Sequence, residues 1–227
     1  MFTSRHLLLF SVLALSVIFE SCAPSADTED TDEQVRGSFY VRYLAEANEL
    51  KGQASFYGAD STALQLANGV AFVSSGTRER KLPGDIIRYE TTMNVPYPEE
   101  LRFNFQLPNK EASTEVKYNL TGIPNYEIVE ASKESGLILE LNGTLAEGET
   151  LLLLFTDPNQ EARTILRPGP LSREQLLIPA DALTLFTPGE YRLYLVKQVE
   201  VKAKVAGLSY DFSAEYYSPE AVFTLEE

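Results

Sequence analysis

The side chains that most often carry enzyme chemistry are scarce in this chain of 227 residues. Its single histidine, His6, and its single cysteine, Cys22, both lie near the N-terminus. Ser-His-Asp and Cys-His nucleophilic sites need an imidazole base, and zinc sites in proteins draw on His and Cys ligands. Without the first 21 residues none of these sites can form. Carboxylate pairs, Ser-Lys pairs and tyrosines are then the groups left for catalysis.

Two acidic pairs are the remaining catalytic candidates, Glu99 with Glu100 and Glu147 with Glu149. A retaining glycosidase needs two carboxyl groups about 5–5.5 Å apart on either side of a cleft. Each pair here lies beside a proline or a glycine in a predicted turn, where acidic side chains serve solubility. We therefore predict no catalytic residue, no cofactor and no metal site, and a protein that is not an enzyme.

Four further motifs have residue types suited to a ligand or a modification. The segment 157–160, Asp-Pro-Asn-Gln, offers oxygens for Ca²⁺ but lacks the ligand spacing of an EF-hand, so a β-turn is predicted. Segments 119–121 and 142–144 match the N-glycosylation sequon, and the second is better explained as a turn. Asp60-Ser61-Thr62 resembles an O-glycosylation motif of some bacteria.

Cys22 follows an apolar run, residues 7–19, that has basic residues before it and the small residue Ser21 after it. The run is shorter than the ~20 apolar residues of a transmembrane helix and has the length of a signal-peptide core. The region resembles the lipobox of bacterial lipoproteins at Ser21 and Cys22, whereas Phe19-Glu20 departs from it. The resemblance implies that residues 1–21 are a lipoprotein signal peptide and that Cys22 carries a membrane-anchoring lipid.

Residues 22–34 are predicted to be a disordered acidic tether, because Pro, Ser, Thr and carboxylates dominate them and cannot bury apolar area. Surface lipoproteins of Bacteroidota-type bacteria carry an acidic export signal close to the lipidated cysteine. The acidic tract here is similar but begins later, at Asp27. The resemblance implies anchoring at the bacterial outer membrane, with the cell surface slightly favoured over the periplasm.

The charge of the chain excludes one class of partner. Removal of residues 1–21 takes away one base and one acid, so the mature chain keeps 18 basic and 32 acidic residues and a net charge of −14. Such a surface repels nucleic acids, and no Lys/Arg cluster interrupts it along the sequence. We predict no nucleic-acid partner and leave a protein or glycan ligand open.

The aromatic residues bear on the glycan alternative. Tryptophan, the largest aromatic platform for sugars, is absent, whereas 12 tyrosines are present. Two aromatic groups are predicted to be mainly core side chains or cross-strand pairs, and individual tyrosines remain candidates for a ligand groove. These groups are Phe39, Tyr40 and Tyr43, and Tyr210, Phe212, Tyr216 and Tyr217.

Apolar and polar residues alternate almost everywhere after residue 35, as in 87–93, 101–107 and 116–120. This period of two is typical of antiparallel sheets with one face on a core and the other in water. We therefore predict an all-β body made of two tandem antiparallel β-sandwich domains, 35–122 and 123–227. Turn signals separate the strands at Lys51-Gly52, Asn68-Gly69, Pro83-Gly84, Pro108-Asn109, Asn142-Gly143, Pro158-Asn159, Pro188-Gly189 and Ala206-Gly207.

The second half contains three stronger signals. The continuous apolar run 151–155 predicts a central strand covered on both faces. Gly189-Glu190-Tyr191 before a long apolar strand resembles the tyrosine corner of Ig-like domains, which implies a tyrosine hydroxyl bonded to backbone upstream. Segments 199–205 and 208–216 alternate around Ala206-Gly207 and predict a long hairpin. Its outward charges would protect a sheet edge, or the hairpin would project and pair with a neighbour.

Together these features predict a non-enzymatic, lipid-anchored envelope or cell-surface protein that acts as a binding or scaffold module. Two alternatives remain open. One is a polymerising or adhesive surface subunit, for which Arg36 would be a maturation cut after the tether. The other is a carbohydrate-binding accessory protein.

Overall fold

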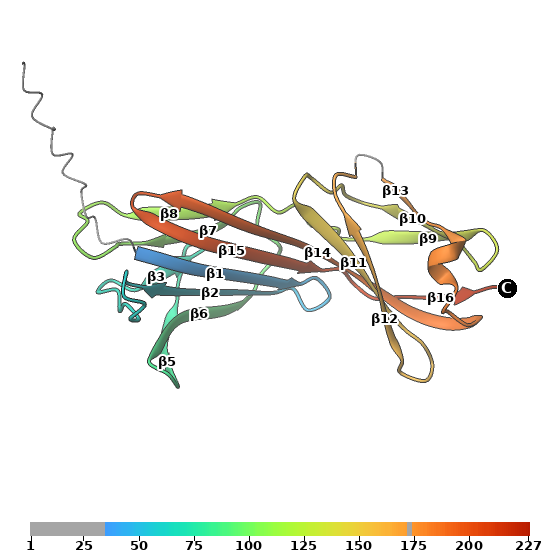
Figure 1. The fold of residues 1–227 in the computed structure, drawn as a ribbon, viewed down its shortest axis with the longest axis horizontal. Coiled ribbons are helices and arrows are strands. Elements are labelled where there is room, and N and C mark those ends of the chain that lie inside the picture. Colours follow the sequence, from blue (N-terminus) through green and yellow to red (C-terminus); the bar gives the residue numbers. More distant parts are fainter. Residues whose placement is uncertain (1–34, 172–173) are drawn as a thin grey trace, which may run out of the picture. The chain divides into compact units, whose positions relative to one another are not determined.

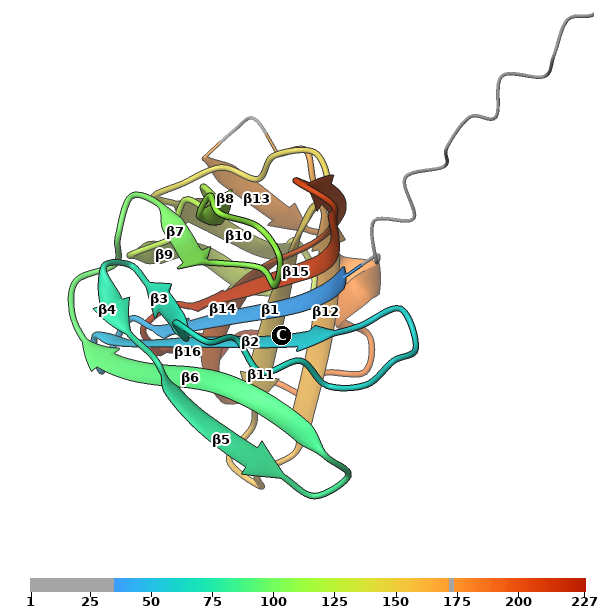
Figure 2. The ribbon, with the colours of Figure 1, turned by 90° about the vertical axis from the view of Figure 1, so that its left-hand side faces the viewer.

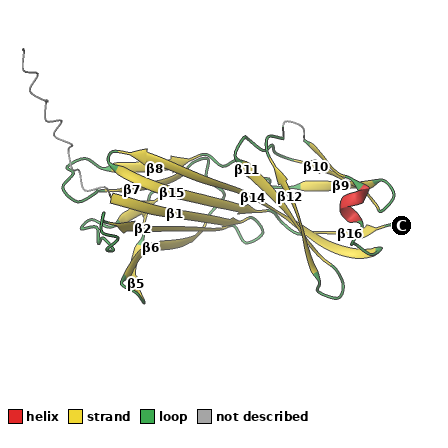
Figure 3. Cartoon of the chain, in the orientation of Figure 1, coloured by secondary structure: helices red, strands yellow, loops and turns green. Residues whose placement is uncertain are grey.

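The computed structural model describes residues 35–171 and 174–227, and β-strands form nearly all of its regular structure. Within these ranges a single short 3-10 helix, η1 (Ala180–Leu183), interrupts the strands (Figure 1, Figure 3). The all-β antiparallel fold class is therefore confirmed. The predicted signal peptide 1–21, Cys22 and the tether 22–34 lie outside the described residues.

Sheet A contains nine strands in the order β12-β11-β14-β15-β1-β2-β6-β5, with β16 also paired to β14 (Figure 2). Its pairs are antiparallel except β1 with β15, which is parallel. The strands are β1 (Val35–Leu44), β2 (Glu49–Tyr57), β5 (Arg78–Leu82), β6 (Ile86–Asn94), β11 (Glu149–Thr156), β12 (Ala162–Pro168), β14 (Gly189–Val205), β15 (Leu208–Tyr217) and β16 (Ala221–Leu225).

Two smaller sheets complete the fold. Sheet B has the order β4-β3-β7-β8 and sheet C the order β13-β10-β9. Sheet B consists of β3 (Val70–Phe72), β4 (Ser75–Gly76), β7 (Leu101–Phe105) and β8 (Thr114–Tyr118). Sheet C consists of β9 (Tyr126–Ser132), β10 (Gly136–Leu141) and β13 (Gln175–Ile178).

Core 1 is the apolar layer between sheet A and sheet B. Because apolar and polar residues alternate along the strands, each of the two sheets directs one apolar face into this core. Phe39 of β1 and Phe56 of β2 meet Phe103 and Phe105 of β7, with ring centroids about 5–6 Å apart. The hairpin adds Phe212 and other residues of β15 to the same core. The predicted strands 87–93, 101–107 and 116–120 correspond to β6, β7 and β8.

One predicted turn, Lys51-Gly52, is wrong, and packing gives the reason. Gly52 lies in the middle of β2, and the chain turns earlier, between Leu44 and Glu49. A Cβ atom on Gly52 would lie 2.4 Å from Cδ1 of Phe72 in β3. The glycine is therefore needed for close approach of sheet B rather than for a turn.

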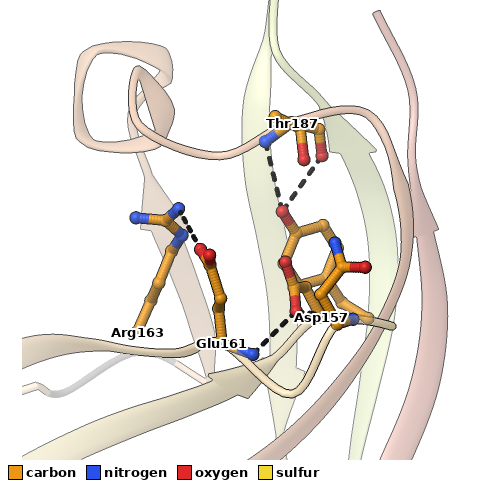
Figure 4. Close-up of polar contacts among 6 residues, drawn as sticks. Asp157, Glu161, Arg163 and Thr187 are labelled. Carbon is orange, nitrogen blue, oxygen red and sulfur yellow. Dashed lines mark hydrogen bonds and ion pairs between the residues drawn. The ribbon is translucent and has the colours of Figure 1, made fainter.

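Core 2 is the apolar layer between sheet A and sheet C, formed by residues of β10, β11, β13, β14 and β16 together with Leu183 of η1. Tyr191 at the start of β14 is buried in it. Its hydroxyl donates to the carbonyl of Thr187 at 3.0 Å and accepts the amide N–H of Thr187 at 3.2 Å (Figure 4). The predicted tyrosine corner is confirmed.

Strand β14 enters both cores and thereby joins them through one sheet. Leu193 and Leu195 belong to core 2, whereas Val199, later in the same strand, belongs to core 1. The predicted hairpin is confirmed, since β14 and β15 pair from Val196–Tyr217 to Val205–Leu208. On its other side β15 pairs with β1 of the same chain.

The boundary predicted near residue 122 coincides with a change of core, because Leu120 belongs to core 1 and Ile123 to core 2. The hairpin, however, returns residues after 199 to core 1. Contacts group the described residues, 35–171 and 174–227, in one compact unit. The division into tandem domains 35–122 and 123–227 stays a prediction.

Candidate functional site

The carboxylate pairs singled out in the sequence do not line a shared cleft. Glu100 contacts Arg102 at 3.6 Å and Lys117 at 3.5 Å in a surface cluster. Glu147 is exposed in the turn before β11, whereas Glu149, two residues later, is buried. The two members of that pair therefore lie in different environments and have no common substrate surface.

Glu149 instead forms a buried ion pair with Lys197 of β14, which is 1% exposed. The Lys197 ammonium donates to Glu149 Oε2 at 2.8 Å, to the carbonyl of Thr144 at 2.7 Å and to Oγ1 of Thr121 at 3.0 Å. Glu149 Oε2 also accepts the amide N–H of Ala146 at 2.6 Å. All three N–H donors of the ammonium are used. The pair therefore links two segments to β14: the connection around residue 121 and the loop before β11.

Asp157 is occupied by its own turn and offers no open cation site. Its Oδ1 accepts the amide N–H of Glu161 at 2.8 Å (Figure 4). It also accepts the amide N–H of Asn159 at 2.9 Å, and the Gln160 amide closes the turn with a 3.0 Å bond to the Asp157 carbonyl. The predicted β-turn is confirmed. Arg163, which pairs with Glu161 at 3.3 Å, also lies over the ring of Phe186. No cluster of three possible metal ligands occurs within the described ranges 35–171 and 174–227.

The possible modification motifs have structural roles. Thr121 of the first sequon accepts a bond from Lys197, as described above. Asp60 Oδ1 accepts both the amide N–H and the hydroxyl of Thr62, at 2.9 and 2.7 Å. Arg36, the proposed maturation position, donates from Nη2 to Ser61 Oγ at 2.6 Å.

A hollow of about 670 Å³ over sheet C is lined in part by three exposed carboxylates, Glu127, Glu140 and Glu174. Glu127 and Glu140 are direct cross-strand partners in β9 and β10. Sequence spacing gave no sign of this cluster, because its members come from separate strands.

Basic side chains also gather where the sequence showed no cluster. The β5–β6 hairpin places Arg80 directly opposite Arg88, and Arg78 opposite Glu90. Arg80 pairs with Glu90 at 2.7 Å, which offsets part of the positive charge. The exclusion of nucleic acid rests on net charge and stays a prediction.

The most distinctive surface is the outer face of sheet A, the side that faces away from core 1 and core 2. Strand pairing aligns five apolar residues there into one continuous row across β12, β11, β14, β15 and β1. We call this the apolar row: Leu166, Leu152, Val196, Tyr217 and Leu44. None of these five belongs to core 1 or core 2 as the described residues define them.

Further apolar residues adjoin this row on one side, whereas the row on its other side is polar: Thr150, Gln198, Glu215 and Arg42. Val196 is 3% exposed although it lies outside both cores. Leu166 of β12 is 54% exposed, and Leu154 and Tyr194 are half-buried beside the row. The prediction that strand 151–155 is covered on both faces is wrong. Leu151, Leu153 and Phe155 are buried, whereas Leu152 and Leu154 face outward. The structure covers only one side of β11.

A hollow of about 340 Å³ opens beside the row, between the β1–β2 turn and the end of β15. Tyr194 and Tyr217 form a parallel pair in it, with ring centroids 6.2 Å apart and an interplanar angle of 29°. Glu46, Ser218 and Glu220 supply its polar lining. An apolar hollow with a few polar groups is the usual form of a ligand site.

Several charged side chains that border the outer face have partners within the chain. Arg42 contacts Glu49 at 3.4 Å, and Arg192 contacts Glu220 at 3.6 Å. Glu215 accepts hydrogen bonds from the hydroxyls of Tyr40 at 2.8 Å and Tyr217 at 3.1 Å. Burial, followed by the charge of Glu215, raises the pKa of Tyr217 to about 12. Both hydroxyls therefore stay neutral and donate at physiological pH.

The predicted aromatic roles hold in the main, because Phe39, Tyr43, Phe212 and Tyr216 are buried in core 1. Tyr40 and Tyr217 instead reach the outer face. Sequence analysis missed Tyr194 and Leu152 as surface residues. The available signal was the unbroken apolar run of β11, which places every second side chain on the outer face.

Comparison with known proteins gives no relative from which a function could be transferred: no protein family and no curated protein matches this chain. Among the residues that the structure describes, no helix is long and apolar enough to cross a membrane. Cys22, the predicted lipidation site, lies outside those residues.

Proposed function

We propose that this chain is a non-enzymatic, lipid-anchored envelope protein of the bacterial outer membrane that acts as a binding or scaffold module. The observation that carries the binding role is the apolar outer face of sheet A. Exposed apolar patches bordered by polar residues are typical of interaction sites in soluble domains. The anchor rests on the sequence around Cys22.

Membrane fractionation of the Cys22→Ser variant tests the anchor. Wild type is expected in the outer-membrane fraction with incorporated fatty acid, and Cys22→Ser is expected to lose the label and leave that fraction. Protease added to intact cells then distinguishes surface exposure from a periplasmic location. Retention of Cys22→Ser equal to wild type would disprove the anchor without bearing on the outer face.

Carbohydrate recognition is the second candidate, favoured by the parallel Tyr194–Tyr217 pair in the 340 Å³ hollow. Aromatic faces stack on sugar rings, and carboxylates such as Glu46 accept bonds from sugar hydroxyls. A glycan array probed with wild type and Tyr194→Ala tests this role. Binding that Tyr194→Ala abolishes supports it, and a blank array rejects it.

A further inference from the structure

The hollow of about 340 Å³ beside the apolar row has a lining with one sign of charge. Its lining residues are Leu44, Ala45, Glu46, Ala47, Tyr194, Tyr217, Ser218 and Glu220. Two of them are acids and none is a base. Because its volume lies at the lower end of the ~300–1,000 Å³ of ligand sites, the hollow suits a small chemical group.

Free hydrogen-bond donors are scarce in this hollow. The Ser218 hydroxyl donates to a backbone carbonyl at 3.0 Å and accepts a backbone N–H at 2.9 Å. The Tyr217 hydroxyl donates to Glu215 at 3.1 Å. Among the described residues that line the hollow, Tyr194 alone keeps a side-chain donor without a hydrogen-bond partner. A ligand that donates hydrogen bonds therefore suits this lining better than one that accepts them.

The two carboxylates of the hollow are only partly balanced by basic side chains. Glu46 is exposed in the β1–β2 turn, and no ion pair or hydrogen bond holds its side chain within the part of the chain that the structure describes. Glu220 contacts Arg192 at 3.6 Å, but the Arg192 side chain is 60% exposed, and exposed pairs are weak. A cation in the hollow therefore meets at least one unpaired carboxylate. The net charge of −14 in the mature chain adds a general attraction for cations.

The two tyrosine rings supply a second attraction for positive charge. Tyr194 of β14 and Tyr217 of β15 are half-buried and line the hollow, with ring centroids 6.2 Å apart. An ammonium or guanidinium group within ~6 Å of an aromatic centroid is attracted by the ring quadrupole. Leu44 and Ala45 add apolar surface for the hydrocarbon part of such a ligand.

We propose that this hollow binds an organic cation, an ammonium or guanidinium group on a short hydrocarbon stem. The stem lies against Leu44 and the tyrosine pair, and the charged end meets the carboxylates of Glu46 and Glu220. The inference rests on the proposed binding role and names the chemical class of the ligand. A neutral sugar gains less from the same lining, because it has no positive charge. A free alkylamine and a Lys or Arg side chain of a peptide share the required chemistry.

NMR titrations of the mature chain from residue 22, carrying Cys22→Ser, test the proposal with small probes. The cations n-butylammonium and n-butylguanidinium are expected to bind with dissociation constants on the order of 1–10 mM. Butanol lacks the charge and butyrate has the opposite charge, so both are expected to bind at least about threefold more weakly. Added salt weakens binding of the cations and leaves that of butanol unchanged. A blocked Gly-Lys-Gly peptide identifies the source: binding tighter than that of n-butylammonium assigns a peptide side chain, and weaker binding assigns a free amine.

Three variants locate the binding site. Glu46→Gln removes a charge at an exposed position and is expected to raise the dissociation constant of n-butylammonium about two- to fivefold. Tyr194→Leu keeps apolar area but removes a ring, with an expected rise of about two- to fivefold. The matched control is Glu147→Gln, which changes the net charge equally at an exposed position outside the hollow and keeps the wild-type affinity. Circular dichroism confirms folding of all three.

Three outcomes would overturn the proposal: no binding of either cation up to about 50 mM, butanol or butyrate bound as tightly as n-butylammonium, or equal affinities of Glu46→Gln and Glu147→Gln. A neutral glycan that binds through Tyr194 while the cations do not bind would assign the hollow to a sugar instead. A protein that binds no cation but still depends on Cys22 for its place in the membrane fraction would keep the proposed anchored function and lose only the cationic ligand.

Discussion

At the scale of single residues, the buried ammonium of Lys197 depends on the oxygen atoms around it. A charge in the interior is tolerated when a partner and hydrogen bonds replace water. Glu149, Thr144 and Thr121 supply these oxygens from two separate segments of the chain. The pair therefore connects these two segments to β14.

Removal of one partner of this pair is expected to be costly. Lys197→Met leaves Glu149 charged and buried, so the free energy of unfolding in urea falls by about 3–5 kcal/mol. The double variant Lys197→Met/Glu149→Gln removes both charges, keeps an acceptor for Ala146 and is expected to recover about 2 kcal/mol. Lys202→Met, at an exposed ion pair with Asp211, is the control and leaves stability unchanged. A double variant no more stable than Lys197→Met would contradict this account.

Buried tyrosines make the fold sensitive to alkali. Burial raises the pKa of Tyr97, whose hydroxyl donates to the Leu120 carbonyl at 2.6 Å, and raises the pKa of Tyr216 to about 12. The unfolded chain loses these protons near pH 10, so stability is complete below about pH 10 and falls as the pH rises toward the folded-state values.

Thermal unfolding between about pH 8 and pH 11, followed together with tyrosinate absorbance, measures this loss. Tyr97→Phe has one such proton fewer. Its melting temperature is expected to be lower than that of wild type near neutral pH, and to fall less steeply in alkali. Equal slopes for the two proteins would show that Tyr97 does not contribute.

At the scale of elements, the hairpin of β14 and β15 shows how one strand can serve two environments. Its first half pairs with β11 and β16, while residues 200–205 pair with β15 alone among the described strands. Glu200, Lys202 and Lys204 point outward along that free edge. Charged residues on an edge oppose pairing of that edge with another chain.

Gly122, between the two cores, is expected to tolerate no side chain. A Cβ atom there would lie 2.4 Å from Cε2 of Tyr216, which the rings of Tyr43 and Tyr97 hold in place. Overpacking of this kind costs about 1–3 kcal/mol, so urea unfolding of Gly122→Ala has a lower midpoint. Gly76→Ala, with no atom within 4 Å of its Cβ position, keeps the wild-type midpoint. A similar loss in both variants would contradict this account.

At the scale of the whole molecule, the shared strand β14 predicts one cooperative unit. Leu50 of core 1 and Leu139 of core 2 are both fully buried, and each Leu→Ala change costs about 2–5 kcal/mol. Both variants are expected to shift a single urea transition that circular dichroism and side-chain NMR signals of the two cores report alike. Two separate transitions, each sensitive to one variant, would instead establish independent domains.

Local patterns were enough to predict part of this fold. The alternation in β6, β7 and β8, the tyrosine corner at Tyr191 and the hairpin turn at Ala206-Gly207 all depend on residues close in sequence. Gly52 shows the limit, since its neighbours suggest a turn while Phe72 of another sheet requires the glycine. No local pattern contains that contact.

The sequence by itself determined an all-β body, the scarcity of catalytic side chains and a candidate anchor at Cys22, because these follow from composition and from a period of two. Tertiary structure alone decided that β15 lies beside β1, that Lys197 meets Glu149 and that five apolar residues align on one outer face. Each of these depends on the register between strands distant in the chain, and register is set by the packing of the whole sheet.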